Sequence, residues 1–382
     1  MSIRNLTAKL YRMIVTIMLF GPASVFAAYS ELNMPQSVTD LGAEIYDLHM
    51  IIFWIVTIAG IAVFAVMIYS IFNHRKSKGA VAEQFHESTS VEVVWTIIPL
   101  IILVIIAIPA TSTLLKYEDT SNSDITITAT GYQWKWKYDY QKEDISFFSA
   151  LAEDSNKARQ LGAKVDLSAV DNYLLNVDNP IVVPVNKKIR VLTTSNDVIH
   201  AWWVPDLAIK RDAIPGFINE SWFKANKVGT YRGQCAELCG KDHGFMPIVV
   251  KVVEEAEYTA WVGKQKADMA AADAASDKTF TMAELMKKGE KAYNTSCSGC
   301  HQINGAGLAP TFPALVGSKI ATGPMKDHID MVMNGSKANP MMAAYAAQLN
   351  NLELAAIITY ERNAWGNNTG DLVQPSEIKA AR

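Results

Sequence analysis

Hydrophobic residues are concentrated in the first third of the chain, in blocks that differ in length and in the residues around them. The first block, Met13 to Phe20, follows three basic residues and precedes the small-residue end Ser24-Val25-Phe26-Ala27. This order is typical of a cleaved signal peptide, which we assign to residues 1–27. No cysteine stands directly after the block, which excludes lipid attachment there, so we expect the membrane anchor to come from later segments.

Two longer apolar stretches predict transmembrane helices at about residues 48–72 and 92–115. Each is long enough to cross the hydrocarbon core of a bilayer, and two prolines in the second are tolerated as kinks. The loop between them is basic, which the positive-inside rule places in the cytoplasm. The basic residues are Arg75, Lys76 and Lys78. Residues 28–118 therefore predict a two-helix transmembrane hairpin with both ends facing outward.

The pattern changes after this hairpin. Short β-branched segments separated by turn-rich stretches predict an antiparallel β-domain, and an Ala-, Lys- and Glu-rich helical linker follows. Thr281 and Glu284 match a capping box that opens a small α-helical domain. The predicted boundaries are 119–254 for the β-domain, 255–280 for the linker, 281–366 for the helical domain with its closing helix at 352–363, and 367–382 for a C-terminal tail.

Composition excludes one class of partner. Half of the residues are hydrophobic and the formal net charge is -3. No basic stripe is available to neutralise phosphates, so we expect no nucleic-acid partner. The fold class is that of a multi-domain membrane protein.

The four cysteines form two pairs, Cys235 with Cys239 and Cys297 with Cys300, and a histidine follows each pair closely. In an exported protein such pairs can form disulfides. A chain of 382 residues, however, can bury an ample core without these links. The pairs therefore predict two cofactor sites, with disulfides as the alternative.

The first pair shares one short loop with His243 and Met246, and His200 stands alone upstream. Thiolates, imidazoles and a thioether together suit copper and offer nothing to a hard ion such as Ca²⁺. A mononuclear blue-copper site needs only one cysteine, whereas a second thiolate allows two sulfur bridges and hence two copper ions. A structural zinc site with two cysteines and two histidines stays open, although zinc has no use for the methionine.

The second pair belongs to the segment Cys297-Ser298-Gly299-Cys300-His301, which matches the c-type haem attachment motif. Two thioether bonds would fix the porphyrin, and His301 would supply the proximal nitrogen. A methionine is the expected sixth ligand of a high-potential haem, and His328 is the alternative. The methionine candidates are Met325, Met331, Met333, Met341 and Met342.

The chain resembles cytochrome c oxidase subunit II over residues 29–254. The resemblance implies a cupredoxin-like all-β barrel behind the transmembrane hairpin. It is carried by Gln234-Cys235-Ala236-Glu237-Leu238-Cys239-Gly240, His243, Met246-Pro247, Val198-Ile199-His200-Ala201-Trp202, the aromatic block 131–140 and Asp212-Ala213-Ile214-Pro215-Gly216.

By position, this resemblance implies a dinuclear copper centre of the CuA type. Cys235 and Cys239 would bridge the two ions, while His200 and His243 would each bind one of them. Met246 would cap one ion, and the backbone carbonyl of Glu237 would reach the other. The resemblance also implies that the carboxylate of Glu237 binds Mg²⁺ at the interface with subunit I.

Two further residues take roles from the same resemblance. Most aromatic residues of block 131–140 are expected to pack within a sheet, whereas Trp134 would be an exposed residue through which electrons reach the copper. Lys135 departs from the family pattern, which usually has an aromatic residue there. Glu92 would be the cytoplasmic mouth of a proton path into subunit I, although a capping box with Thr89 would explain this glutamate equally well.

The C-terminal region resembles the all-α, class I cytochrome c domains that are fused to caa-type oxidases. In these domains the ligand methionine precedes a small-aromatic-x-x-Gln-Leu run, which selects Met342. The resemblance thus predicts that covalent haem c is held by Cys297, Cys300, His301 and Met342.

The resemblance implies a subunit II that passes electrons from haem c through CuA to subunit I, where oxygen is reduced to water with proton pumping. None of the chain's seven histidines lies within the apolar stretches Met50–Phe72 and Val93–Leu115, so oxygen cannot be reduced on this chain itself. Expected partners are subunit I, subunit III, and a cytochrome c or other electron donor. The expected location is the bacterial inner membrane, with copper and haem on the periplasmic side.

Two alternatives from other classes remain. One is a membrane-anchored haem c and copper carrier that serves another acceptor, such as a nitrogen-oxide reductase. The other is a copper-handling protein that uses its cysteines for metal exchange, which would not need a covalent haem on the same chain.

Overall fold

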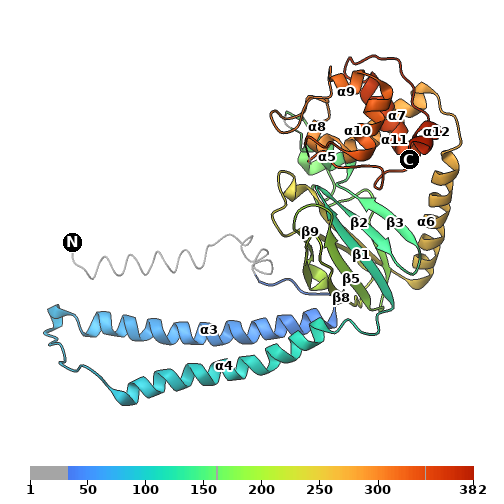
Figure 1. The fold of residues 1–382 in the computed structure, drawn as a ribbon. Coiled ribbons are helices and arrows are strands. Elements are labelled where there is room, and N and C mark those ends of the chain that lie inside the picture. The colour runs from blue at the N-terminus through green and yellow to red at the C-terminus, as the bar shows by residue number, and fades with distance from the viewer. Residues whose placement is uncertain (1–32, 161, 340) are drawn as a thin grey trace. The chain divides into compact units, whose positions relative to one another are not determined.

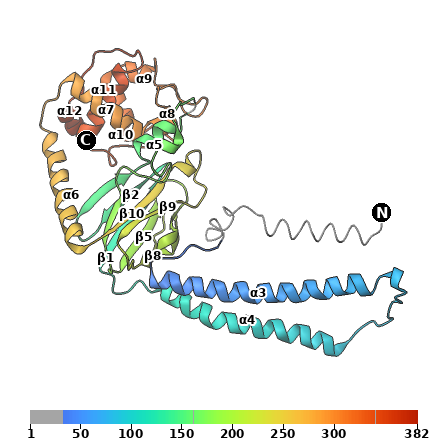
Figure 2. The same ribbon diagram turned by 180° about the vertical axis from the view of Figure 1, so that it is seen from behind.

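The computed structural model describes residues 33–160, 162–339 and 341–382. The predicted signal peptide at residues 1–27 lies outside the described residues. The chain divides into two compact units, one containing residues 42–110 and the other containing residues 111–382. Figures 1 and 2 show the elements of these units from opposite sides.

The first unit is built mainly from α3 (Asp40–Asn73) and α4 (Thr89–Glu118), which run side by side in Figures 1 and 2. Both are long and apolar enough to cross a membrane. They extend beyond the predicted spans at 48–72 and 92–115, because helical backbone bonding continues into the polar residues that flank each apolar run. The loop between them contains the 3₁₀ turn η2 (Lys76–Lys78).

The second unit begins with a sandwich of two five-stranded sheets, in the orders β3-β2-β1-β5-β8 and β4-β10-β9-β6-β7. Side chains alternate between buried and partly buried along β1 and β5, so one face of that sheet lies in the core. This arrangement is the predicted cupredoxin-like fold. The strands are β1 (Ile125–Tyr132), β2 (Lys135–Tyr140), β3 (Ile145–Ser149), β4 (Ile181–Pro184), β5 (Ile189–Ser195), β6 (His200–Val204), β7 (Ile209–Ala213), β8 (Asn219–Phe223), β9 (Gly229–Cys235) and β10 (Pro247–Val253).

The sandwich is not antiparallel throughout. β1 pairs with β5 in parallel, and so does β4 with β10, so the prediction of an antiparallel domain is wrong at these two pairs. Alternation along a strand indicates which face is buried but not the direction of its neighbour. Parallel partners come from distant parts of the chain, and only the assembled sheet reveals them.

Short helices and turns connect the strands of the sandwich, and one long helix follows its last strand. Helix α6 (Glu255–Ala275) forms the predicted helical linker. Its first half packs on the sandwich, where the Trp261 and Tyr140 ring centroids lie 5.1 Å apart. The shorter elements are α5 (Glu153–Ala158), η3 (Leu167–Ala169), η4 (Pro205–Leu207) and η5 (His243–Phe245).

A helical domain ends the chain. Thr281 and Glu284 form the predicted capping box, in which the Thr281 side chain accepts from the Glu284 N–H and the Glu284 carboxylate accepts from the Thr281 N–H. The helices are α7 (Met282–Ser296), α8 (Ser298–His301), α9 (Lys319–Thr322), α10 (Met325–Asn334), α11 (Asn351–Asn363) and α12 (Pro375–Ala381).

Two features of this domain position the second cysteine pair. Gly289 in α7 is in close contact with α11, since a Cβ atom there would lie only 2.1 Å from the Ala356 carbonyl oxygen. Helix α7 ends directly at Cys297, so this backbone contact holds the start of the haem motif. The segment predicted as a tail differs from expectation, because α12 forms there and buries Ile378 beside Val373.

Candidate functional site

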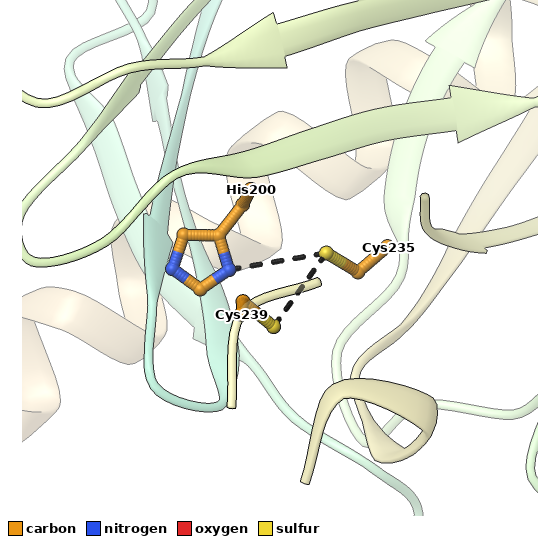
Figure 3. A group of neighbouring side chains, drawn as sticks. All are labelled: His200, Cys235 and Cys239. Carbon is orange, nitrogen blue, oxygen red and sulfur yellow. Dashed lines mark hydrogen bonds between the residues drawn. The ribbon is translucent and has the colours of Figure 1, made fainter. Parts of the chain in front are cut away.

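A cluster of sulfur and nitrogen atoms lies where β6 begins and β9 ends. Figure 3 shows that the side chains of His200, Cys235 and Cys239 point toward one another. The two Sγ atoms lie 3.8 Å apart, and Cys235 Sγ lies 3.9 Å from His200 Nδ1. All three side chains are buried, and their ligand atoms lie within 4.8 Å of one another. This cluster has the separations expected of donors that share metal ions.

The remaining predicted donors join the same cluster. Cys239 Sγ lies 3.5 Å from His243 Nδ1 and 3.5 Å from Met246 Sδ. The Glu237 carbonyl oxygen lies 3.3 Å from Cys235 Sγ, while the Glu237 side chain is exposed. The fold thus brings together all six groups predicted to bind copper. The thioether of Met246 is buried against a thiol, which suits soft copper better than zinc.

The imidazole of His200 is held in place from behind. Its Nε2 lies 2.9 Å from Asp197 Oδ1, so an Nε2 proton donated to this carboxylate leaves Nδ1 free to face the thiols. Burial disfavours the charged ring, but hydrogen bonds with Asp197 and Cys235 outweigh it and raise the pKa of His200. Gly131 accommodates the ring, because a Cβ atom there would lie 2.6 Å from His200 Cδ2.

The two thiols interact strongly with each other. Their hydrogen bond lowers the pKa of Cys235 well below that of a free thiol, against the opposing effect of burial. The same hydrogen bond and burial raise the pKa of Cys239. One thiolate is therefore readily formed, and a bound cation would favour loss of the second proton. Both cysteines are free, and their 3.8 Å separation far exceeds a disulfide bond of about 2.05 Å.

The haem motif lies beside an apolar cavity in the helical domain. His301 is nearly buried, and its Nδ1 lies 2.9 Å from the Pro313 carbonyl oxygen. Donation to this carbonyl leaves Nε2 available to iron. The cavity has a volume of about 170 Å³, and its walls include Cys297, Cys300, His301, Phe312, Leu315, Ile320, Val332, Met342 and Tyr345. Two free thiols, an oriented imidazole and an apolar wall fit a covalently attached haem.

The structure separates the methionine candidates. Met333 packs in the hydrophobic core of the helical domain, with Met325 against it. Met331, Met341 and Met342 line the cavity instead. Met341 is 46% exposed, whereas Met342 is partly buried. These positions are consistent with Met342 as the sixth ligand, which stays a prediction.

The alternative ligand His328 also lines the cavity, and its Nδ1 is buried without a hydrogen-bond partner among the described residues. His328 Nε2 lies 2.8 Å from Glu361 Oε2, and both residues are buried. Sequence reasoning missed Glu361. A carboxylate directly after the apolar run of helix α11 was the signal that could have indicated a buried pair.

Trp134 lies between the copper loop and the haem motif. Its Nε1 donates to the Cys239 carbonyl oxygen at 3.0 Å. A Cβ atom on Gly240 would lie 3.2 Å from Trp134 Cζ2, and one on Gly299 would lie 3.9 Å from Cε3. The ring is therefore only partly exposed, which corrects the expectation of an exposed side chain. Lys241 adds a second link by donating to the Gly299 carbonyl oxygen at 2.7 Å.

Glu92 lies at the start of α4 and is exposed. Its carboxylate accepts a hydrogen bond of 3.4 Å from the Ser88 N–H, so it caps the helix through Ser88 and not through Thr89. This capping contact accounts for a glutamate at the helix start and leaves its role in proton transfer a prediction.

Three families match separate parts of the chain. Residues 125–253 match the family described as cytochrome C oxidase subunit II, periplasmic domain. Residues 27–112 match its transmembrane domain, and residues 284–360 match cytochrome C oxidase, cbb3-type, subunit III. The β-sandwich, the helical hairpin and the helical domain therefore each have relatives among oxidase subunits.

Individual relatives agree with these matches. A Rickettsia bellii protein named "Probable cytochrome c oxidase subunit 2" is 38% identical over 236 residues, covering 62% of this chain and 84% of the relative. Cytochrome c oxidase subunit 2 of Arabidopsis thaliana is 36% identical, over 62% of this chain and 89% of the relative. The crystal structure of the periplasmic domain of subunit II of cytochrome oxidase from Bradyrhizobium japonicum is 47% identical, over 39% of this chain and 98% of that chain, with a TM-score of 0.35.

Proposed function

This chain belongs to the cytochrome c oxidase subunit II family, and from that premise we propose that it accepts electrons through covalent haem c and delivers them through CuA to subunit I. The family matches establish a terminal oxidase component with a fused cytochrome c domain. The β-sandwich β1–β10 is called the copper domain below, and helices α7–α12 are called the haem domain.

The position of Trp134 is the observation that supports this function most directly. Its indole donates to the backbone of Cys239 on one side and lies against Gly299 of the haem motif on the other. Electron transfer becomes faster as the intervening gap shortens, and Trp134 is close to both the copper loop and the haem motif. We therefore assign Trp134 as the residue through which electrons pass to the copper domain.

The ligand sets follow from the geometry of the two centres. Dinuclear copper supplies one-electron chemistry with little rearrangement when its donors are preformed. His200, Cys235, the Glu237 carbonyl, Cys239, His243 and Met246 would hold it. Cys297 and Cys300 would attach the haem, with His301 and Met342 as axial ligands.

Other parts of the proposal rest on the family resemblance. We propose that the exposed carboxylate of Glu237 binds Mg²⁺ at the interface with subunit I, and that Glu92 opens a proton path into that subunit. The assembled complex, with subunits I and III and a cytochrome c or other donor, would reduce oxygen and pump protons. Residues 1–27 would be a signal peptide, and both redox domains would lie on the periplasmic side of the bacterial inner membrane.

The proposal can be tested on the full-length protein in its oxidase complex. We expect two copper ions at this subunit, with a paramagnetic signal shared by both, and one covalent haem c. Rapid photoreduction of the haem should be followed by reduction of the copper, and Trp134→Phe should slow that step at least about tenfold. Trp222, also partly buried, provides the control variant Trp222→Phe. A site containing zinc and no copper in both redox states would refute the assignment.

A further inference from the structure

Lys135 is the least expected residue in the contact between the two redox domains. It follows Trp134 directly and is only 5% exposed. Lysine is almost never buried to this extent without a charged or hydrogen-bonding partner. No group among the described residues accepts a hydrogen bond from its Nζ, which is sealed from solvent.

The ammonium group of Lys135 lies between rings from the two domains. Its Nζ is 4.5 Å from the centroid of Phe148 in the copper domain and 5.2 Å from that of Tyr345 in the haem domain. The Tyr345 hydroxyl donates to the Ser296 carbonyl oxygen, which holds this ring beside the haem motif. The haem domain therefore completes the burial of a copper-domain cation.

Hydrogen bonds also cross this contact, although Asn294 Oδ1 is buried there without a partner among the described residues. Asn156 donates to the Asn294 carbonyl oxygen at 2.9 Å, and Lys241 donates to Gly299. Such contacts stabilise docking, whereas a buried charge without a hydrogen-bonding partner opposes it.

Burial and nearby charged groups together decide whether Lys135 strengthens or weakens the contact between the domains. The groups that face it are Asp178, which precedes β4, Glu353 in the first turn of α11, and Cys297. Burial lowers the pKa of Lys135 to about 8 in spite of the opposing attraction to the carboxylates of Glu353 and Asp178. Cys297 would carry no charge once its sulfur is bonded to haem. The charged form is therefore held less favourably here than in water, and at neutral pH it weakens the contact.

We propose that Lys135 keeps the docking of the haem domain on its own copper domain reversible, so that the same haem face can separate from Trp134 and meet an external electron donor. This inference rests on the proposed function, because a mobile haem domain is useful only if Trp134 receives its electrons. A single face must then serve two partners in turn. Tight docking would block the donor, and weak docking would slow delivery to the copper.

The test compares three variants in the intact oxidase. Lys135→Met removes the charge and keeps the length of the side chain, and Lys135→Arg keeps the charge. Lys137→Met is the matched control, because Lys137 lies two residues along β2, is only partly buried and pairs with Asp139. Pulsed paramagnetic resonance between oxidised haem and copper measures the fraction of molecules with a short distance between the centres.

We expect Lys135→Met to raise the ratio of docked to undocked molecules by about threefold or more. It should slow haem reduction by a soluble donor in the same proportion. Lys135→Arg and Lys137→Met should match the unchanged protein. Lys135→Gln serves as a second neutral variant if the methionine variant assembles poorly.

An unchanged or lower docked fraction in the neutral variants would overturn the role of Lys135. The proposed function is tested separately by electron transfer in the unchanged protein. If the docked fraction rises as expected but no electron passes from haem to copper, the function fails and the docking role stands. If electrons pass normally and no variant alters docking, the proposed function stands and the docking role of Lys135 fails.

Discussion

Single residues around the copper site show that orientation matters as much as donor type. His200 is buried completely and presents Nδ1 to the thiols because Asp197 occupies its Nε2. Carboxylates that orient a ligating histidine fix its tautomer and raise its basicity. The acidic residue three positions before a candidate ligand is therefore part of the site, although it would touch no metal.

Replacing Met246 tests the soft donor directly. Met246→Leu keeps nearly the same buried volume, so the stability of the copper domain should change by less than about 1.5 kcal/mol. Loss of the thioether, which lies 3.5 Å from Cys239 Sγ, should perturb the copper absorption and leave the haem spectrum intact. Optical spectra of the purified complex measure both. An unaltered copper band would argue against this thioether as a donor.

Replacing Met342 tests the sixth haem ligand. Met342→Leu should lower the haem reduction potential and alter the haem spectrum, because a neutral sulfur ligand favours the reduced iron. The neighbouring Met341 is 46% exposed and provides the control Met341→Leu, which should leave both unchanged. Redox titration of the two variants measures the haem reduction potential of each. Equal potentials would exclude Met342 and direct attention to Met331, which also lines the cavity.

At the scale of elements, the contact of α7 with α11 sets the position of the haem motif. Gly289 lets the two backbones touch, and α7 delivers Cys297 at its end. Helix α12 covers the same core with Ile378. The haem domain thus holds its attachment site through close helix packing, which leaves little room for larger side chains.

Gly289→Ala tests this packing. The added Cβ would lie 2.1 Å from a backbone oxygen that cannot move alone, so the helices must separate and the haem domain should lose about 2–3 kcal/mol of stability. Thermal unfolding followed by the visible circular dichroism of the haem measures the loss. Gly263→Ala in α6 is the control, because its Cβ would meet nothing within 4 Å. That variant should be neutral or gain up to about 1 kcal/mol.

At the scale of the whole molecule, the two predicted redox centres lie in one compact unit, and the helical hairpin forms most of the other. Trp134 and Lys135 are neighbours in sequence, yet we propose opposite roles for them at the contact between the domains. Trp134 would pass electrons to the copper domain, and Lys135 would keep the docking reversible. Reversible docking should therefore respond to pH through Lys135.

The sign of this pH dependence follows from the pKa of about 8 for docked Lys135. Undocked, the side chain regains water and an ordinary pKa of about 10.4. Between these values the undocked form binds more protons, so docking strengthens as pH rises, by up to about tenfold from pH 7 to pH 9. Reduction of the haem by a soluble donor should slow accordingly. Lys135→Met should lack this dependence, and an equal response in both proteins would contradict the assignment.

Local sequence determined much of this protein. Continuous apolar runs are sufficient to predict α3 and α4, because a helix forms all its backbone hydrogen bonds within its own segment. The capping box at Thr281 acts within one helical turn. Five of the six predicted copper donors lie within residues 235–246, and the haem motif occupies five consecutive residues. Each of these features is encoded by neighbours in the chain, so its pattern is visible without the fold.

Only the tertiary structure decided how these parts meet. His200 reaches Cys235 across 35 residues, and Trp134 reaches Cys239 across 105 residues. The parallel pairing of β1 with β5 and the burial of Lys135 beneath Tyr345 likewise depend on which elements become neighbours. Periodicity fixes the face that a side chain occupies and says nothing of what covers that face. Packing between distant segments supplies the covering groups, including those around Trp134 and Lys135 from which the electron route and its control are proposed.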